Sequence, residues 1–203
     1  MTRRSGRNRP WCIVLTCEHA SAAVPNALAD LGLPAAVLRS HRAFDQGALP
    51  IARALAKALQ VPLFAGSWSR LVADLNRSAH HAKVIAARID GSTVPGNRLS
   101  VAARQARLAK YWQPWRREVE RHLTTLAARG PVLHLAIHSF VERLGGVERH
   151  NDIGLLCDPA RTREVAFCRA MQQSLRELGW SVRRNFPYFG NTDGLTTDRK
   201  SVV

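Results

Sequence analysis

Two histidines follow short apolar runs that have the composition of buried strands. His19 follows WCIVLTC with Glu18 between them, and His138 comes directly after VLHLAI. In α/β sheets, ligands bind beyond the carboxyl ends of the strands, so two such histidines can converge on one metal ion. A single histidine at a strand end is more often structural, and it is the pairing of two that indicates a metal site.

A third metal ligand is expected to be a carboxylate, because two histidines and a carboxylate with one open position form the usual catalytic zinc site. Two residues qualify: Glu18, and Asp45 in the segment HRAFDQGA. Asp45 could instead cap the helix predicted to follow it. His41, in the same segment, is a candidate to support a ligand or to contact the substrate.

The segment SRLVADLNR places four polar residues close together: Arg70, Asp74, Asn76 and Arg77. In an extended segment, Arg70, Asp74 and Asn76 share one face, because side chains alternate along a strand. Arginine suits bidentate carboxylate binding and asparagine adds a donor, so this cluster is a candidate site for an anionic substrate. The alternative is an ion pair between Arg70 and Asp74 that stabilises a loop.

Two further positions are candidate substrate contacts. Ser139 follows His138, and Tyr188 lies in NFPYFGNTDG, a segment that could cover a ligand. Asparagine and glycine are equally typical of a surface turn, so the local sequence leaves both roles open for this loop.

The elements that must position these residues alternate between short apolar runs and stretches of helical period. This alternation predicts one α/β domain with a largely parallel or mixed sheet. Residues 80–97 form a long excursion that could be a mobile flap. Helices are expected over 49–59, over 100–129 with a kink near Gln113–Pro114, and over 162–179. Strands are expected at WCIVLTC, VPLFAG, VLHLAIHSF as a central strand, DIGLLCD and WSVRRN, with a possible further strand at SRLVADL.

The formal net charge of +15 raises the question of nucleic-acid binding. Only four of the 30 basic residues are lysines, and the arginines are spread along the chain as in proteins from GC-rich genomes. RRSGRNR is the one basic block, and no helix-turn-helix, RRM or zinc-finger pattern is present. Nucleic-acid binding therefore remains an alternative, while a positive field equally suits small anionic substrates.

The cysteines and the N-terminus bear on the compartment. Four cysteines without CxxC spacing are expected to be buried thiols, not metal ligands or disulfides. The N-terminal apolar run is too short for a signal peptide or a membrane span, so we expect a cytoplasmic protein.

Six segments in order resemble the motif series of the N-formylglutamate amidohydrolase family: TCEHASAAVP, HRAFDQGA, SRLVADLNR, HLAIHSF, DIGLLCDP and NFPYFGNTDG. The resemblance implies a three-layer α/β/α sandwich with a mixed, largely parallel sheet, related in fold to the zinc carboxypeptidases. It implies one divalent metal ion, expected to be zinc, and a substrate that is N-formylglutamate or a related small acidic N-acyl amino acid. CEHA, in place of a PHSG-like form, indicates a sister branch of the histidine-pathway enzymes.

Carried over by motif, the resemblance implies that His19 and His138 hold the metal with Asp45 or Glu18 as the carboxylate. It further implies that Arg70, Asn76 and Arg77 match the family's SR…DLNR motif, in which the Asn-Arg pair resembles the carboxylate-binding pair of the carboxypeptidases.

The general acid or base is less clearly indicated. The resemblance implies that the general acid or base is a glutamate in an EIR-like strand after the NxPYxG loop. This chain stops before such a strand. Glu18 is the candidate within the chain, with Glu142 and Glu148 as substitutes. The last six residues, DRKSVV, match the translation of a common sequencing adapter. We therefore expect an incomplete domain over 1–197, a non-native tail over 198–203, and an inactive metal- or anion-binding fragment as a further alternative to the hydrolase.

Overall fold

The structure is a computed structural model of the 203-residue chain, and it describes residues 10–144, 146–191 and 194–198. The basic block RRSGRNR and residues 199–203 of the expected tail lie outside the described residues. At the centre is a parallel sheet with the strand order β2-β1-β5. Its strands are β1 (Cys12–Cys17), β2 (Leu63–Ala65) and β5 (Val132–Ala136).

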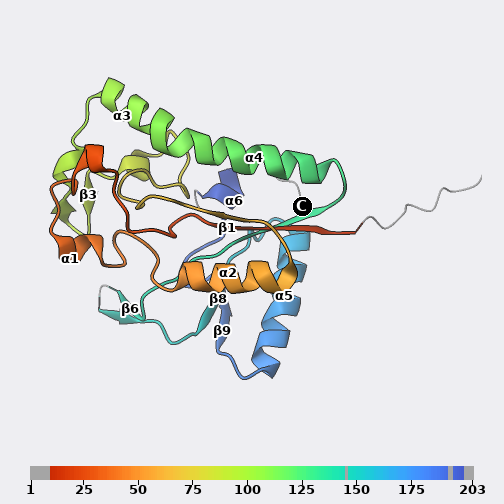
Figure 1. The fold of residues 1–203 in the computed structure, drawn as a ribbon. Coiled ribbons are helices and arrows are strands. Elements are labelled where there is room, and N and C mark those ends of the chain that lie inside the picture. The colour runs from red at the N-terminus through yellow and green to blue at the C-terminus, as the bar shows by residue number, and fades with distance from the viewer. Residues whose placement is uncertain (1–9, 145, 192–193, 199–203) are drawn as a thin grey trace, which may run out of the picture.

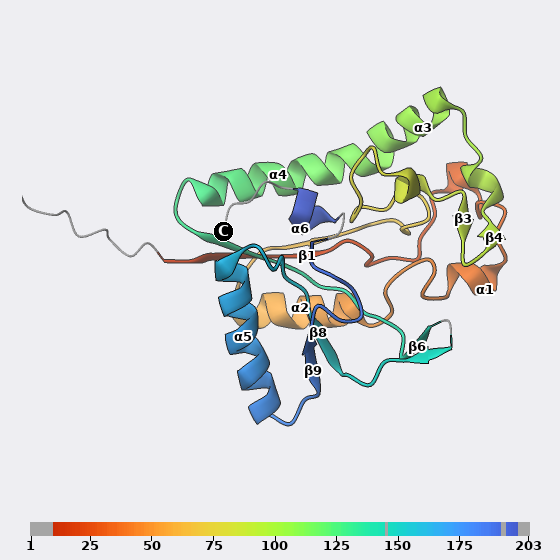
Figure 2. The same ribbon diagram turned by 180° about the vertical axis from the view of Figure 1, so that it is seen from behind.

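Helices cover both faces of this sheet (Figure 1). α2 (Ala48–Leu59) packs on β1 and β2, and its buried alanines Ala48 and Ala52, one turn apart, let it lie close to the strands. α4 (Gln113–Ala127) packs on β1 and β5, and α6 (Leu195–Asp198) lies beside it, as the reverse view in Figure 2 also shows. The α/β sandwich with a largely parallel sheet is thus confirmed.

The long helix predicted over 100–129 is present, and it is interrupted as expected. It consists of α3 (Val101–Arg107), a π-helical turn η4 (Leu108–Trp112) and α4. The Ser100 side chain caps its start by accepting a hydrogen bond from the Ala103 N–H. Pro114 has no N–H to donate, so the wider turn falls directly before it.

A second, two-stranded parallel sheet is formed by β8 (Ile153–Leu155) and β9 (Val182–Arg184), which α5 (Thr162–Glu177) connects. Within the described residues, β5 pairs with β1 alone. The expectation of a central strand there is therefore wrong for this part of the chain. The apolar composition of β5 is that of a buried strand, and composition does not report whether a strand pairs on one side or on both.

The possible strand at SRLVADL is also wrong, because this segment is a buried turn. Its backbone N–H groups bond to three different parts of the chain: Ser69 to Ala23 (2.7 Å), Arg70 to Ala43 (3.1 Å) and Asp74 to Val84 (2.7 Å). A strand would direct them to one neighbour. The apolar residues of the segment are buried in a side-chain cluster and not in a β-ladder. Both environments produce the same pattern of apolar residues in the sequence.

Residues 80–97 are folded onto the body of the protein, which replaces the flap expected from the sequence. Val84, Ile85 and Val94 are buried, and the Asn97 side chain donates to the Leu71 and Ala86 carbonyls at 2.9 Å each. The segment contains the helical turns η2 (Ala82–Ile85) and η3 (Pro95–Asn97) and the hairpin of β3 (Arg88–Ile89) with β4 (Ser92–Thr93).

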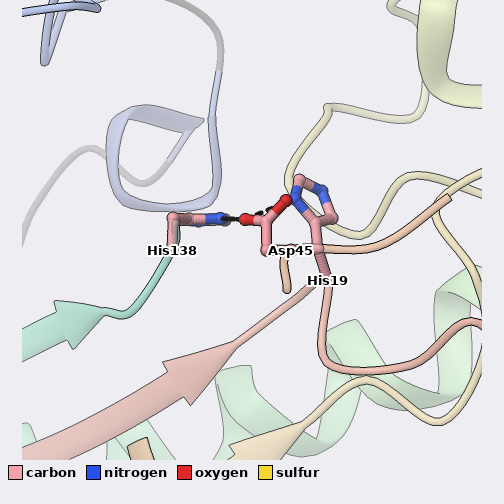
Figure 3. A group of neighbouring side chains, drawn as sticks. All are labelled: His19, Asp45 and His138. Atoms are coloured by element: carbon pink, nitrogen blue, oxygen red, sulfur yellow. Dashed lines mark hydrogen bonds and ion pairs between the residues drawn. The ribbon is translucent and has the colours of Figure 1, made fainter. Parts of the chain in front are cut away.

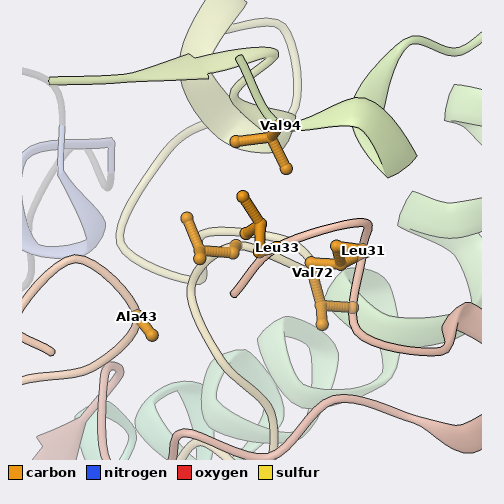
Figure 4. Close-up of a cluster of buried hydrophobic side chains, with 6 residues drawn as sticks. Leu31, Leu33, Ala43, Val72 and Val94 are labelled. Atoms are coloured by element: carbon orange, nitrogen blue, oxygen red, sulfur yellow. The ribbon is translucent and has the colours of Figure 1, made fainter. Parts of the chain in front are cut away.

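A hydrophobic cluster anchors the loops beyond the carboxyl edge of the sheet (Figure 4). Its buried members come from residues 19–47 and from 66–97, and they are Leu31, Leu33, Ala43, Leu71, Val72 and Val94. The first of these loops also carries the short helices η1 (Asn26–Leu28) and α1 (Ala35–Leu38). A second hairpin, β6 (Arg143–Leu144) with β7 (Val147–Glu148), follows β5.

The four cysteines are free, and Cys17, Cys157 and Cys168 are buried as expected, whereas Cys12 is only partly buried. Burial raises the pKa of the Cys17 thiol to about 12, so it stays protonated at neutral pH. No helix in the described part of the chain is both long and apolar enough to cross a bilayer.

Candidate metal and active site

His19 and His138 meet at the carboxyl edge of the sheet, because they follow the neighbouring parallel strands β1 and β5. Their ring centroids are 4.9 Å apart. Asp45 lies between them (Figure 3), and its Oδ2 is 3.3 Å from Nδ1 of His19 and 2.8 Å from Nδ1 of His138. Asp45 is held there by its own backbone N–H, which donates to the His19 carbonyl at 2.9 Å. Both Nδ1 atoms therefore face one carboxylate oxygen.

These three side chains could hold a metal ion, since each offers one ligand atom and the atoms lie within 4.8 Å of one another. Tetrahedral zinc with bonds of about 2.0–2.1 Å separates its ligand atoms by about 3.3 Å, close to the spacing around Asp45 Oδ2. The Asp45 side chain is 7% exposed and that of His138 is 28% exposed, so the group is reached from the His138 side. Of the two carboxylates that the sequence left open, Asp45 is the one that joins the histidines.

The far nitrogen of each imidazole faces a second buried carboxylate. Nε2 of His19 is 2.7 Å from Oδ1 of Asp74, and Nε2 of His138 is 3.1 Å from Oε2 of Glu18. Asp74 is held by Arg70, whose guanidinium donates to Oδ2 at 2.9 Å, and by the Asn76 backbone N–H, which donates to Oδ1 at 2.9 Å. The sequence placed Asp74 beside Arg70, in a candidate anion site or in an ion pair, and its contact with His19 depends on the fold.

The network shifts the pKa values of its members. Burial alone raises the pKa of a carboxyl group, but the close approach and charge of His138, together with the Thr16 hydroxyl, outweigh burial and lower the pKa of Glu18 to about 2. The pKa values of Asp45 and Asp74 also fall, against burial, because His138 and His19 bond to the first and His19 and Arg70 lie beside the second. Burial disfavours protonated His138, yet Asp45 and Glu18 raise its pKa to about 10. The buried carboxylates thus create a strong demand for positive charge, which a metal ion would meet.

A cavity of about 490 Å³ opens beside this group. Asp45 and Asp74 form part of its wall, so it reaches one candidate ligand and the carboxylate partner of His19. Five cationic side chains line it: Arg42, Arg70, Arg77, Lys83 and Arg88. A cavity with this lining suits a small anionic molecule.

The predicted substrate contacts are divided by the structure. Arg70, Arg77, His41, Ser139 and Tyr188 line the cavity. Asn76 is absent from the lining, because its side-chain Oδ1 accepts a hydrogen bond from the Leu195 N–H at 2.9 Å. His41 lies 4.0 Å from Asp90 at the outer wall, and the Ser139 N–H approaches Asp45 Oδ2 at 3.4 Å.

A family model described as N-formylglutamate amidohydrolase matches residues 11–201. The chain belongs to the N-formylglutamate amidohydrolase family. The match includes the candidate metal group, which is His19, Asp45 and His138, and also the SRLVADLNR turn and the loop of Tyr188. A search of curated proteins gives no match to the chain.

This member of the N-formylglutamate amidohydrolase family is similar to a solved structure, the crystal structure of gene product Atu2144 from Agrobacterium tumefaciens. The two sequences are 36% identical, and the structures superpose with a TM-score of 0.82. The alignment covers 92% of this chain and 73% of the Agrobacterium chain. The fold described above is therefore shared with an experimentally determined structure.

Three glutamates were candidates for proton transfer in this amidohydrolase-family chain, and they lie in different places. Glu18 is fully buried, and Glu148 pairs with Arg143 in the β6–β7 hairpin. Glu142 lines the cavity. A general base must reach the proton that it removes, so Glu142 is the best placed of the three.

Tyr188 is oriented by a cationic partner at the cavity rim. The Arg149 guanidinium lies over the Tyr188 ring at 5.2 Å and over the Phe140 ring at 5.9 Å from the ring centroids. Phe140 and Tyr188 both line the cavity. Arg149 thus joins the loop after β5 to the loop after β9, and the local sequence gives no sign of this contact.

Proposed function

We propose that this protein is a metal-dependent hydrolase that cleaves the amide bond of N-formylglutamate or of a related small acidic N-acyl amino acid. The observation that carries the proposal is the convergence of His19, Asp45 and His138 beside a cavity lined by cationic side chains. Membership of an amidohydrolase family supports the reaction class.

Zinc is the metal that best suits this group. Two imidazole nitrogens and one carboxylate oxygen with an open side form the usual donor set of a hydrolytic zinc site. When bound, zinc would polarise the substrate carbonyl and lower the pKa of a bound water toward neutrality. Asp45 would supply the negative ligand, and the two imidazoles would bind through Nδ1, since both Nδ1 atoms face Asp45.

Arginines in the cavity wall would bind the carboxylate of the substrate. Arg70 is already paired with Asp74, which fixes the direction of its guanidinium and leaves further N–H groups for an anion. Arg77 lines the same wall. An acidic side chain adds a second carboxylate, which further cations of the cavity wall such as Lys83 and Arg88 could bind, so acidic N-acyl amino acids are expected to bind more tightly than those with an apolar side chain.

Proton transfer is assigned to Glu142 among the described glutamates that the sequence singled out. Its place in the cavity wall allows contact with a substrate, whereas Glu18 has no exposed surface. This assignment replaces the catalytic role that the sequence analysis gave to Glu18. The nucleic-acid alternative gains no support, since its basic block lies outside the described residues.

The test is a zinc-dependent assay of the purified full chain. After removal of metal by a chelator, we expect added zinc to restore formate release from N-formyl-L-glutamate, and N-formyl-L-leucine to be a poorer substrate. His138→Ala should abolish the activity, and His150→Ala is the matched control because its side chain is 80% exposed and lies outside the metal group. Activity that is unaffected by the chelator, or equal loss in both variants, would contradict the proposal.

A further inference from the structure

Glu18 is a fully buried carboxylate that lies next to the metal group without belonging to it. It has no exposed surface, and its Oε1 accepts a hydrogen bond from the Thr16 hydroxyl at 2.7 Å. Its Oε2 makes no well-directed hydrogen bond with the described residues, and Nε2 of His138, 3.1 Å away, is likewise without one. A buried charged oxygen is costly unless it has a partner, so these two atoms are each other's available partner.

The hydrogen bonds behind Glu18 have a fixed direction. The Thr16 oxygen lies 2.8 Å from Nε2 of His134, across the β1–β5 pair. An ionised carboxylate only accepts hydrogen bonds, so the single Thr16 hydroxyl hydrogen is donated to Glu18. Thr16 must then accept from the N–H of His134. The row therefore runs from His134 through Thr16 to Glu18, and it leaves Glu18 able to accept one more hydrogen, from His138.

We infer that Glu18 is a positioning residue for His138. It accepts the Nε2–H of the neutral imidazole, which places the hydrogen on the far nitrogen and directs the lone pair of Nδ1 toward Asp45 and His19. Asp74 stands in the same relation to His19, at 2.7 Å. This inference rests on the proposed metal function, because a neutral histidine with a free Nδ1 is the form that binds a metal ion.

The surroundings of Glu18 exclude its other roles. It does not line the cavity, so it does not contact the substrate, and it faces the nitrogen of His138 that points away from Asp45. The chain after β2 closes over its backbone: a Cβ atom at Gly66 would lie 2.2 Å from the Glu18 carbonyl oxygen. Only glycine fits there, and the Gly66 N–H donates to the Cys17 carbonyl at 2.9 Å.

The test measures zinc affinity of the full chain by competition with a chromophoric chelator. Replacing a carboxylate that orients a metal-bound histidine typically weakens metal binding by about 10–100-fold. We expect a loss of this size for Glu18→Leu. Glu18→Gln should lose less, because the amide oxygen can still accept from His138, and Thr16→Val should lose less in the same direction. Val14→Ala is the matched control, since Val14 is equally buried in β1 and its side chain packs in the apolar cluster with Val119 and Val132.

A spectroscopic signal separates positioning from general destabilisation. In the zinc-loaded protein labelled with 15N-histidine, the Nε2–H of His138 should give a downfield, slowly exchanging proton signal. This signal should be retained in Val14→Ala and lost or shifted upfield in Glu18→Leu.

The outcomes distinguish this inference from the proposed function. If the wild type binds no zinc, or His138→Ala binds it equally well, the metal function fails and the inference fails with it. If His138→Ala abolishes binding while Glu18→Leu and Thr16→Val match Val14→Ala in affinity and keep the His138 signal, the positioning role alone is overturned. Should Glu18→Leu not fold, Thr16→Val and Glu18→Gln decide the matter, because unchanged affinity and an unchanged signal in both would overturn it.

Discussion

Two clusters of buried side chains, one apolar and one charged, are built by the same loops beyond the sheet. The hydrophobic cluster takes Ala43 and Val72, and the charged metal group and its carboxylate partners take Asp45 and Asp74, each only two residues further along the chain. Ala43 and Val72 are fully buried, and Asp45 and Asp74 are nearly so. In each of the two loops, residues two positions apart thus lie in opposite environments, one apolar and one charged.

The difference shows how the two clusters divide the work of making a site. The apolar side chains stabilise one another without directed partners, so they fix where each loop lies. The charged side chains gain little unless every group finds a partner at the right distance, so they depend on loops that are already fixed. The hydrophobic cluster therefore determines position, and the charged group determines chemistry.

The largest effect on stability is expected from a substitution in the hydrophobic cluster. Leu71 is 2% exposed in the hydrophobic cluster, so Leu71→Ala should lower the free energy of unfolding by about 2–5 kcal/mol, through lost burial and a cavity. Urea denaturation measures this change. Leu178→Ala is the control, because Leu178 is 73% exposed and should change stability by less than about 0.5 kcal/mol. Equal losses in both variants would mean that the cluster does not anchor the loops.

The charged cluster should make both the stability of the protein and its zinc affinity depend on pH. As the pH rises above 6.5, the stability contribution of His138 should fall and the zinc affinity should increase. In the metal-free protein the pKa of His138 is raised from 6.5 to about 10, so its contribution to stability is complete below pH 6.5 and is lost as the pH rises toward 10. The pKa of Glu18 is lowered from 4.5 to about 2, so its contribution is complete above pH 4.5 and is lost as the pH falls toward 2.

Urea denaturation of metal-free wild type and His138→Ala should therefore show the largest stability difference between about pH 4.5 and 6.5. Zinc must displace the proton on His138, so zinc affinity should rise by about tenfold for each pH unit between 6 and 9. The stability loss of Leu71→Ala should stay constant over this range. A zinc affinity that is flat with pH would show that His138 is not protonated in the metal-free site.

A smaller effect is expected where the charged cluster meets the substrate. Arg70→Ala should raise KM for N-formyl-L-glutamate by about tenfold, because a charge-assisted hydrogen bond to the substrate carboxylate is lost. Steady-state kinetics on N-formyl-L-glutamate measures it, with Arg143→Ala as the control, since Arg143 is 67% exposed in a hairpin. An unchanged KM in Arg70→Ala, or an equal change in both variants, would remove Arg70 from carboxylate recognition.

The parts of the site that could be predicted are those whose proximity follows from the strand pattern of the sequence. Parallel strands bring their carboxyl ends to one edge, so the approach of His19 and His138 followed from two apolar runs. The choice between Asp45 and Glu18 did not follow, because it depends on how a loop returns to the sheet. The contact of Glu18 with His138 joins two strands far apart in sequence, which no local pattern reports.

The errors in the fold have a related cause. The alternating apolar residues of SRLVADL have the signature of a strand, yet Leu71 and Val72 are buried in a cluster formed by turns. Sequence periodicity reports burial on one side, and it does not tell whether the backbone bonds to a neighbouring strand or to scattered loops. In the same way, the composition of β5 does not report that it pairs with β1 alone within the described residues.

The most direct test of the metal group is anomalous scattering at the zinc edge from crystals of the full chain grown with zinc. We expect one strong peak about 2.0–2.2 Å from Nδ1 of His19, Nδ1 of His138 and the Asp45 carboxylate, with Glu18 and Asp74 on the far nitrogens of the two imidazoles. A zinc peak elsewhere, or bonding through Nε2 of either histidine, would contradict it.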